Sequence, residues 1–151
     1  MIMRTASFVK AAASIGLYLM LGVVGAASAE VYVVSSATLP INEIAIRELR
    51  SIYKGRLSQV NGYRLTPLNL APGTNDRDAF LERIMDLNEL DYTGYWHVRR
   101  YTGQGTPPTE VGNKEELFTT LKEQPGGIGY LWMPNGIKPK LPDGLKVIRV
   151  K

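Results

Sequence analysis

Residues 72–80 read Pro-Gly-Thr-Asn-Asp-Arg-Asp-Ala-Phe, and they follow a short apolar stretch at Leu65–Leu70. The apolar stretch predicts a β-strand, and Pro67 within it indicates a sheet edge or a strand start. The residues rich in Pro, Gly and Asn predict a loop that ends in a helix cap. Apolar side chains at helical spacing in Asp78–Asp86 then predict a helix. A strand, a loop and a helix in this order indicate an α/β domain.

The loop also carries the best candidate site in the sequence. Thr74 offers a hydroxyl donor, and Arg77 falls in the first helical turn, where a positive charge opposes the helix dipole. An anion beside Arg77 would explain its position, because helix N-termini bind anions readily. The alternative is a capped surface helix in which Asp76 and Asp78 complement the dipole and pair with Arg77. The oxyanion site of the first hypothesis comprises Gly73, Thr74, Asn75, Asp76 and Arg77.

The rest of the chain alternates between strand and helix patterns. β-Branched and aromatic runs predict strands at Val31–Ser35, Ile128–Trp132 and Lys146–Val150. Apolar periodicity predicts helices capped at Thr38 or Asn42 and ending near Tyr53, at Leu90–Arg100, and from the cap Asn113 to Lys122. Asn61-Gly62 predicts a turn, and Thr102–Val111 is too rich in Gly and Pro for regular structure. Such alternation is typical of an α/β domain with a substantially parallel sheet.

Residues 1–29 have the three parts of a secretory signal. A basic start precedes a mostly apolar run, Ala11–Ala26, and Ala27-Ser28-Ala29 is a small-x-small cleavage pattern. The alternative is an uncleaved membrane anchor, because the run approaches the roughly 20 residues that span a bilayer. The cleavage pattern favours removal. We therefore expect a single periplasmic domain of residues 30–151 with no stable membrane span.

Composition excludes several classes of function. Without the signal, 16 Lys and Arg face 14 Asp and Glu, a net charge of +2, because the signal holds Arg4 and Lys10 and no acid. No basic run is present, so nucleic acid is not an expected partner. The chain has no cysteine and one histidine, His97, which excludes thiolate chemistry and a multi-histidine metal site. We expect no metal, no cofactor and no enzyme activity, because no nucleophile–base pair stands out.

Other polar and aromatic side chains have plainer interpretations. His97 is expected to be a packed or surface imidazole rather than a catalytic base. The aromatic residues of the third helical segment are predicted to be core and rim: Tyr92, Tyr95, Trp96 and Tyr101. The glutamates on helix faces are predicted to be solvated charges: Glu43, Glu48, Glu82, Glu89, Glu115 and Glu116. The Thr106-Pro107-Pro108 loop is either a partner contact or a rigid connector.

Several segments resemble the phosphate-binding periplasmic proteins, which are the substrate-binding subunits of phosphate ABC importers. Residues 73–77 resemble the Gly-Ser-Gly-Thr-Arg loop of that family, which precedes a helix containing Phe. Further segments occur in the order of the family: Ile52–Gly55, Gly62 with Pro67, Tyr95-Trp96 with Thr102–Pro108, and Pro125–Tyr130. The resemblance spans about residues 38–135.

The resemblance implies a periplasmic-binding-protein-like (type 2) α/β fold, a three-layer domain with a mixed, mostly parallel sheet. It also implies an exported solute-binding module with weak phosphate or oxyanion recognition, linked to transport or sensing and to an envelope protein partner. The chain departs from the family in two ways. Asn75 and Asp76 stand where the family has Gly and Thr, and the length suits one lobe instead of two. These departures favour the alternative of a protein-interaction module with the same fold that has lost ligand binding.

Overall fold

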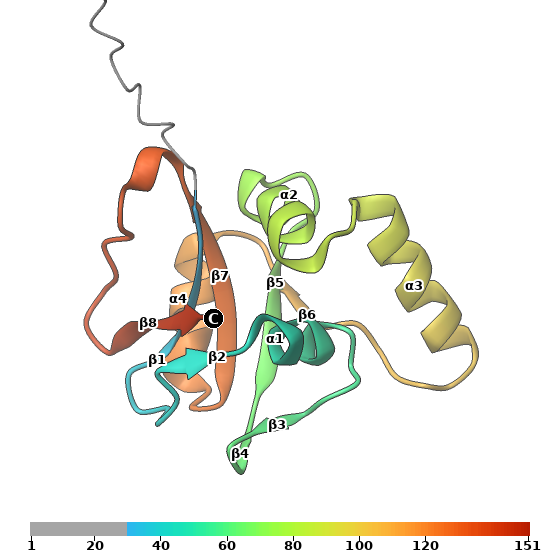
Figure 1. Cartoon of the computed structure of the whole chain (residues 1–151), viewed down its shortest axis with the longest axis horizontal. Coiled ribbons are helices and arrows are strands. Elements are labelled where there is room, and N and C mark those ends of the chain that lie inside the picture. The colour runs from blue at the N-terminus through green and yellow to red at the C-terminus, as the bar shows by residue number, and fades with distance from the viewer. Residues whose placement is uncertain (1–29) are drawn as a thin grey trace, which may run out of the picture.

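A computed structural model describes residues 30–151 of the protein (Figure 1). The predicted signal, residues 1–29, lies outside the described residues, so its cleavage stays a prediction. Within the described part, the helices are all too short or too polar to cross a membrane.

The centre of the fold is a six-stranded sheet with the strand order β2-β8-β1-β7-β5-β6. Strand β1 runs antiparallel to both of its neighbours, and the other adjacent pairs are parallel. The predicted mixed, mostly parallel sheet is therefore confirmed. The strands are β1 Glu30–Ser36, β2 Glu43–Ile44, β5 Thr66–Leu70, β6 Thr109–Val111, β7 Gly127–Met133 and β8 Leu145–Val150.

Helices and one small hairpin complete the fold. The helices are α1 Ile46–Tyr53, α2 Asn75–Phe80, the π-helical η1 Leu81–Met85, α3 Glu89–Tyr101, α4 Lys114–Glu123 and the 3₁₀ turn η2 Pro134–Gly136. The hairpin pairs β3 Gln59–Val60 with β4 Tyr63–Arg64. Its two turn residues, Asn61 and Gly62, have φ values of 51° and 82°. Tight hairpin turns require such positive φ values, so the turn predicted from Asn-Gly is confirmed.

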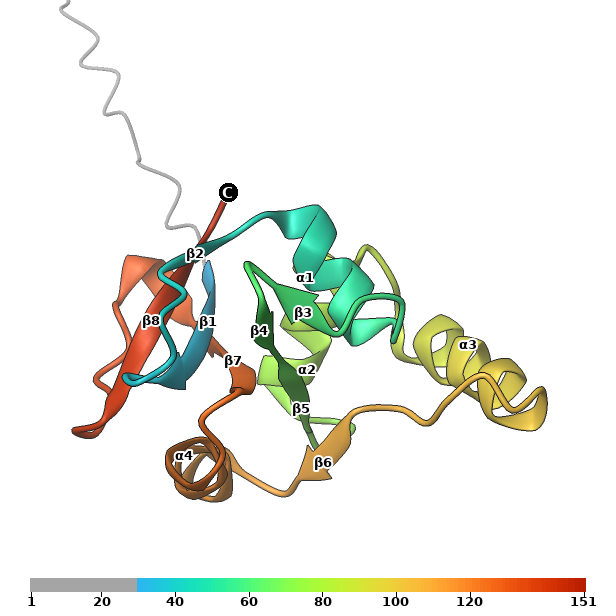
Figure 2. The same ribbon diagram turned by 90° about the horizontal axis from the view of Figure 1, so that it is seen from below.

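Helices cover both faces of the sheet, as neighbouring residues of β7 demonstrate. The Tyr130 ring stacks on the α2 residue Phe80, with centroids 3.9 Å apart and planes 3° from parallel. A Cβ atom on Gly129 would lie only 2.5 Å from Cδ1 of Leu117 in α4. Successive strand residues face opposite sides of a sheet, so α2 and α4 lie on opposite faces, as Figure 2 also shows. The predicted three-layer arrangement is confirmed.

The start of the first helix differs from the prediction. Glu43–Ile44 pairs with Arg149 and Val150 of β8, and this pairing holds the backbone extended where apolar spacing predicted helix. Helix α1 begins after Ala45, whose N–H donates to the Glu48 side chain at 3.0 Å. The caps predicted at Thr38 or Asn42 were therefore wrong, whereas the end of the helix at Tyr53 was right.

The Gly- and Pro-rich segment is also more regular than predicted at its end. Thr109–Val111 forms β6, which pairs in parallel with Leu68–Leu70 of β5. Backbone pairing with β5 overrides the turn-rich local composition, because each paired N–H and C=O would otherwise need another partner. The resulting edge strand brings Glu110 next to the loop that follows β5.

Helix α3 stands apart from the sheet at one end of the molecule (Figure 1). Long side chains anchor it to the end of α1. The hydroxyl of Tyr92 donates to the Tyr53 carbonyl at 3.3 Å, and that of Tyr95 donates to the Lys54 carbonyl at 2.7 Å. The aromatic residues of α3 thus divide into buried anchors, as predicted for core positions, and an outer face that meets solvent.

Candidate functional site

The loop before α2 folds back on itself through Thr74. The Thr74 hydroxyl donates to the Ala71 carbonyl at 2.9 Å and accepts from the Arg77 N–H at 3.3 Å. Thr74 is the N-cap of α2, as its position before the helix predicted. Gly73 has a φ of 83°, which a residue with a side chain adopts only at a cost. The hydroxyl that sequence reasoning assigned to a ligand therefore has internal partners as donor and as acceptor.

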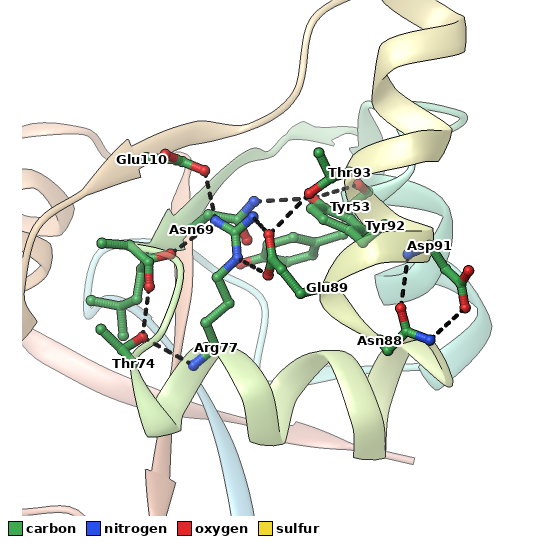
Figure 3. A network of polar contacts seen from close by, with 12 residues as sticks. Tyr53, Asn69, Thr74, Arg77, Asn88, Glu89, Asp91, Tyr92, Thr93 and Glu110 are labelled. Carbon is green, nitrogen blue, oxygen red and sulfur yellow. Dashed lines mark hydrogen bonds and ion pairs between the residues drawn. The ribbon is translucent and has the colours of Figure 1, made fainter.

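The Arg77 side chain turns inward and reaches α3 and β6 (Figure 3). It is only 3% exposed. Its Nε and Nη2 donate to the two carboxylate oxygens of Glu89, each at 2.7 Å. Its Nη1 donates to Glu110 Oε1 at 2.7 Å and to the Leu70 carbonyl at 3.1 Å. Two carboxylates of the chain itself thus occupy the anion positions around the guanidinium.

The charge balance of this cluster is negative. One guanidinium faces the carboxylates of Glu89 and Glu110, whose side chains are 35% and 50% exposed. Burial lowers the pKa of Arg77, but the hydrogen bonds that Arg77 donates to Glu89 and Glu110, together with the charge of Glu89, outweigh this effect and leave the pKa raised. The cation is therefore permanent. The ring of Tyr92, whose centroid is 5.6 Å from Arg77 Cζ, supports it further.

Asp76 points away from Arg77, toward β7 and α4. Its Oδ1 accepts from the Trp132 N–H at 2.8 Å and lies 3.3 Å from Nζ of Lys114. The predicted alternative, in which Asp76 or Asp78 pairs with Arg77, was wrong, because Glu89 and Glu110 hold the guanidinium instead. Gly73 and Asn75 are exposed at the surface of the loop. The five predicted site residues are contiguous in sequence, but their polar groups face different directions and do not converge on one ligand position.

A buried network of phenols and one amide lies beneath Arg77. Asn69 donates to the Tyr92 hydroxyl at 3.0 Å and accepts from the Tyr130 hydroxyl at 3.1 Å. The Tyr130 hydroxyl also accepts from the Leu70 N–H at 3.1 Å. Burial raises the pKa of Tyr53, Tyr92 and Tyr130, so these phenols stay neutral. The network fixes the end of β5 and the loop that leads to Arg77.

Sequence reasoning missed Glu89 and Glu110 as partners of Arg77. The prediction that Glu89 is a solvated charge was wrong, because Arg77 binds both of its oxygens. Helical spacing could not find these contacts, since Glu110 lies 33 residues from Arg77 along the chain. One signal pointed to them: a cation in a first helical turn predicts a nearby anion, and this chain supplies that anion itself.

A small cavity of about 160 Å³ borders the cluster. Its lining includes Arg77 and Glu110 and, from α3, His97 and Arg100. His97 is exposed, as expected for a surface imidazole. Residues 30–151 contain no group of three or more His, Asp or Glu side chains placed to hold a metal ion.

Comparison with solved structures identifies the fold. The chain is similar to an ABC-type phosphate transport receptor from Vibrio cholerae, with a TM-score of 0.58, 14% identity, and coverage of 81% of this chain and 46% of that one. It is also similar to a putative phosphate ABC transporter substrate-binding protein with bound phosphate from Clostridium perfringens, with a TM-score of 0.59, 13% identity, and coverage of 81% and 45%. PstS from Borrelia burgdorferi gives a TM-score of 0.57, 15% identity, and coverage of 81% and 47%.

These similarities concern the fold and less than half of each relative. No protein-family model matches the sequence, and no curated protein has a similar sequence. The matching part spans 45–47% of the length of these three proteins. Residues 30–151 thus have a periplasmic-binding-protein-like α/β fold, of the kind found in the substrate-binding proteins of phosphate ABC transporters.

Proposed function

We propose that this chain is an exported protein-interaction module, built on the fold of a phosphate-binding protein, in which its own carboxylates take the place of a bound anion. One observation carries the proposal: Arg77 is buried, and Glu89 and Glu110 occupy both edges of its guanidinium. The proposal also takes the module to be a single domain without enzyme activity. The similar solved structures support this reading, because they are described as transport receptors and substrate-binding proteins.

Electrostatics oppose an added anion at Arg77. A phosphate would have to displace carboxylates bound at 2.7 Å or sit beside two negative charges. Two unit charges 4 Å apart interact by about 4 kcal/mol near a protein surface, so this repulsion is comparable to the whole binding energy of a weak ligand. The internal carboxylates also need no loss of translational freedom to bind, unlike a free anion.

Weak oxyanion recognition is the competing proposal, and one feature favours it. The cavity beside the cluster brings His97 and Arg100 toward Arg77, so three basic side chains line it. Glu110 lines the same cavity and offsets part of that charge. The fold adds general support, since one similar structure was solved with bound phosphate.

Calorimetry on the exported protein separates the two proposals. We expect no heat of binding with phosphate or sulfate at about 1 mM, a concentration that detects even weak sites. Binding of phosphate by the natural protein that disappears in an Arg77→Ala variant, itself shown by circular dichroism to be folded, would overturn the interaction proposal. Arg47→Ala is the matched control, because Arg47 is an exposed arginine of α1.

Export needs its own test, because the proposal places the module in the periplasm after removal of residues 1–29. We expect N-terminal sequencing of protein from the periplasmic fraction to begin at Glu30. A chain that still begins at Met1 in that compartment would show that residues 1–29 are kept as a membrane anchor and are not cleaved.

A further inference from the structure

Three cations surround one aromatic ring where α3 meets the end of α1. Lys54 Nζ lies 6.0 Å from the Tyr95 ring centroid, and the Cζ atoms of Arg56 and Arg99 each lie 5.7 Å from it. The Tyr95 hydroxyl donates to the Lys54 carbonyl at 2.7 Å, which fixes the ring in place. The rigid ring therefore gathers three positive charges at one point of the surface.

These cations lack acidic partners within the described chain. Among residues 30–151, no carboxylate lies within 4.0 Å of the charged groups of Lys54, Arg56 or Arg99. Arg99 donates to the Gln104 carbonyl at 2.8 Å, which orients it without neutralising it, and its buried Nε has no partner. Three like charges near one ring repel one another, so an external anion would relieve the repulsion.

An exposed apolar row lies on the same helix. Leu90, Val98 and Tyr101 are 82%, 64% and 94% exposed. They follow the spacing that places residues on one helix face, with Gly94 between Leu90 and Val98. Space is open around Gly94, where an added Cβ would have no neighbour within 4 Å. Single exposed apolar residues are ordinary, but an aligned row beside a cationic cluster is typical of a binding surface.

Parts of the cationic cluster and of the apolar row line one open groove of about 490 Å³, whose lining does not include Lys54 or Tyr101. Its cationic part comprises Arg56, Tyr95 and Arg99, and its apolar part comprises Leu90, Gly94 and Val98, which form the neighbouring row of α3. Asp91 also lines the groove, and Asn88 donates to its carboxylate at 2.8 Å. The groove lies at the end of the molecule where α3 stands away from the sheet (Figure 1).

We propose that this groove, termed the α3 groove, binds an acidic, amphipathic segment of a partner protein. Carboxylates of that segment would pair with Arg56, Lys54 and Arg99, and its apolar side chains would cover Leu90 and Val98 at the open position of Gly94. The inference rests on the proposed interaction function and names the chemistry of the partner. Arg56 and Gln104 also border the groove from outside α3, so a narrow segment can enter it, whereas a flat anionic bilayer would rest on its rim.

Peptide binding to the exported full-length protein tests the proposal. The probes are two fluorescent helical peptides of equal length, one with Glu and Leu on adjacent faces and one with Gln in place of Glu. We expect only the acidic peptide to bind, with affinity that falls as salt is added. The double variant Lys54→Glu/Arg56→Glu should weaken binding about tenfold or more. Arg47→Glu, with an exposed arginine outside the groove, should bind as the natural protein does.

Three outcomes would overturn the α3 groove proposal. They are equal binding of the acidic and Gln peptides, unchanged binding in the double variant, and binding of phosphatidylglycerol vesicles in place of the acidic peptide. Circular dichroism checks that the variants fold, and both substituted positions are partly or fully exposed. The phosphate test concerns Arg77 alone, so failure of the interaction proposal is distinguishable from failure of the groove.

Discussion

Arg77 of α2 and Glu89 of α3 are joined by two parallel hydrogen bonds, Nε to Oε2 and Nη2 to Oε1, each 2.7 Å long. This geometry matches the planar guanidinium to the planar carboxylate, and it is stronger than a single contact. Thr93 donates to the same carboxylate at 3.0 Å, which holds it in place. The pair is therefore the polar joint between the helix that follows β5 and the helix that stands apart from the sheet.

Removal of Arg77 should destabilise the fold strongly. Arg77→Ala leaves two carboxylates facing each other without a cation. Loss of one partner of a buried ion pair costs 3–5 kcal/mol, and the partial exposure of both acids reduces this to about 2–3 kcal/mol. Urea denaturation measures the free energy of unfolding. Arg47→Ala should change it by less than about 0.5 kcal/mol, and equal losses in both variants would contradict the assigned role of Arg77.

Glu89 and Glu110 should contribute unequally to the stability of the fold. Glu89 accepts two hydrogen bonds from Arg77 and its side chain is 35% exposed, whereas Glu110 accepts one and is 50% exposed. Glu89→Gln should therefore lower the free energy of unfolding more than Glu110→Gln, with a difference of about 1 kcal/mol. The same denaturation assay compares them. A larger loss in Glu110→Gln would mean that β6, rather than α3, supplies the main partner of Arg77.

Two glycine substitutions should act in opposite directions. A Cβ atom at Gly126 would lie 2.6 Å from the Arg64 carbonyl oxygen, and that backbone cannot move without disturbing the β3–β4 hairpin. Gly126→Ala should therefore destabilise the protein by about 1–3 kcal/mol. Gly94→Ala adds a methyl group in open space within a helix and should stabilise it by about 0.5–1 kcal/mol. Thermal unfolding followed by circular dichroism measures the change in melting temperature for each variant. Shifts of both variants in the same direction would contradict the prediction.

Alkaline pH should unfold the protein as its buried phenols ionise. Burial raises the pKa of Tyr53, Tyr92 and Tyr130 above the ordinary value of 10.0. Below pH 10 these phenols are neutral in both the folded and the unfolded state, so they do not make the free energy of unfolding depend on pH. Above pH 10 the unfolded chain releases protons first, and the free energy of unfolding falls as pH rises. Phenolate absorbance from these tyrosines should appear together with loss of the circular dichroism signal. Their titration in a still folded protein would contradict the buried network.

Acid should weaken the link between β2 and β8. Hydrogen bonds from Lys151 and Arg149 lower the pKa of Glu43 from 4.5 to about 2. The folded state therefore binds fewer protons than the unfolded state between these values, and the contribution of Glu43 to stability fades as pH falls through them. Carbon-detected NMR titration of the Glu43 carboxyl measures the pKa directly. In Glu43→Gln, the stability deficit relative to the natural protein should shrink over the same pH range.

Local patterns predicted the elements well where burial and periodicity agree. Strands β1, β7 and β8 were predicted from short apolar stretches rich in β-branched or aromatic residues, and the Asn113 cap of α4 was identified from its position. The resemblance to phosphate-binding proteins predicted the layered sheet correctly. Strands β2 and β6 were missed, because both are short and owe their conformation to pairing with distant segments, β8 and β5.

The candidate site was predicted less completely than the fold. The odd placement of Arg77 at a helix start was a correct signal of a nearby anion. The identity of that anion depends on how α3 and β6 pack around α2, which no local pattern encodes. Asp76 was considered as a possible partner of Arg77, yet it caps the β7 backbone at Trp132 instead. The direction of each side chain, rather than distance along the sequence, determines which partners Arg77 and Asp76 have.

The position of β1 between β7 and β8 has a consequence for how the chain matures. Residues 30–36 lie near the start of the chain, yet their register partners are residues 128–133 and 145–148. The centre of the sheet therefore cannot close until residues 128–133 and 145–148 have left the ribosome. Sheets that depend on such distant pairs form slowly. Under the proposed export, a newly made chain would still be open when it is threaded through a membrane channel, and it would complete its sheet only on the far side.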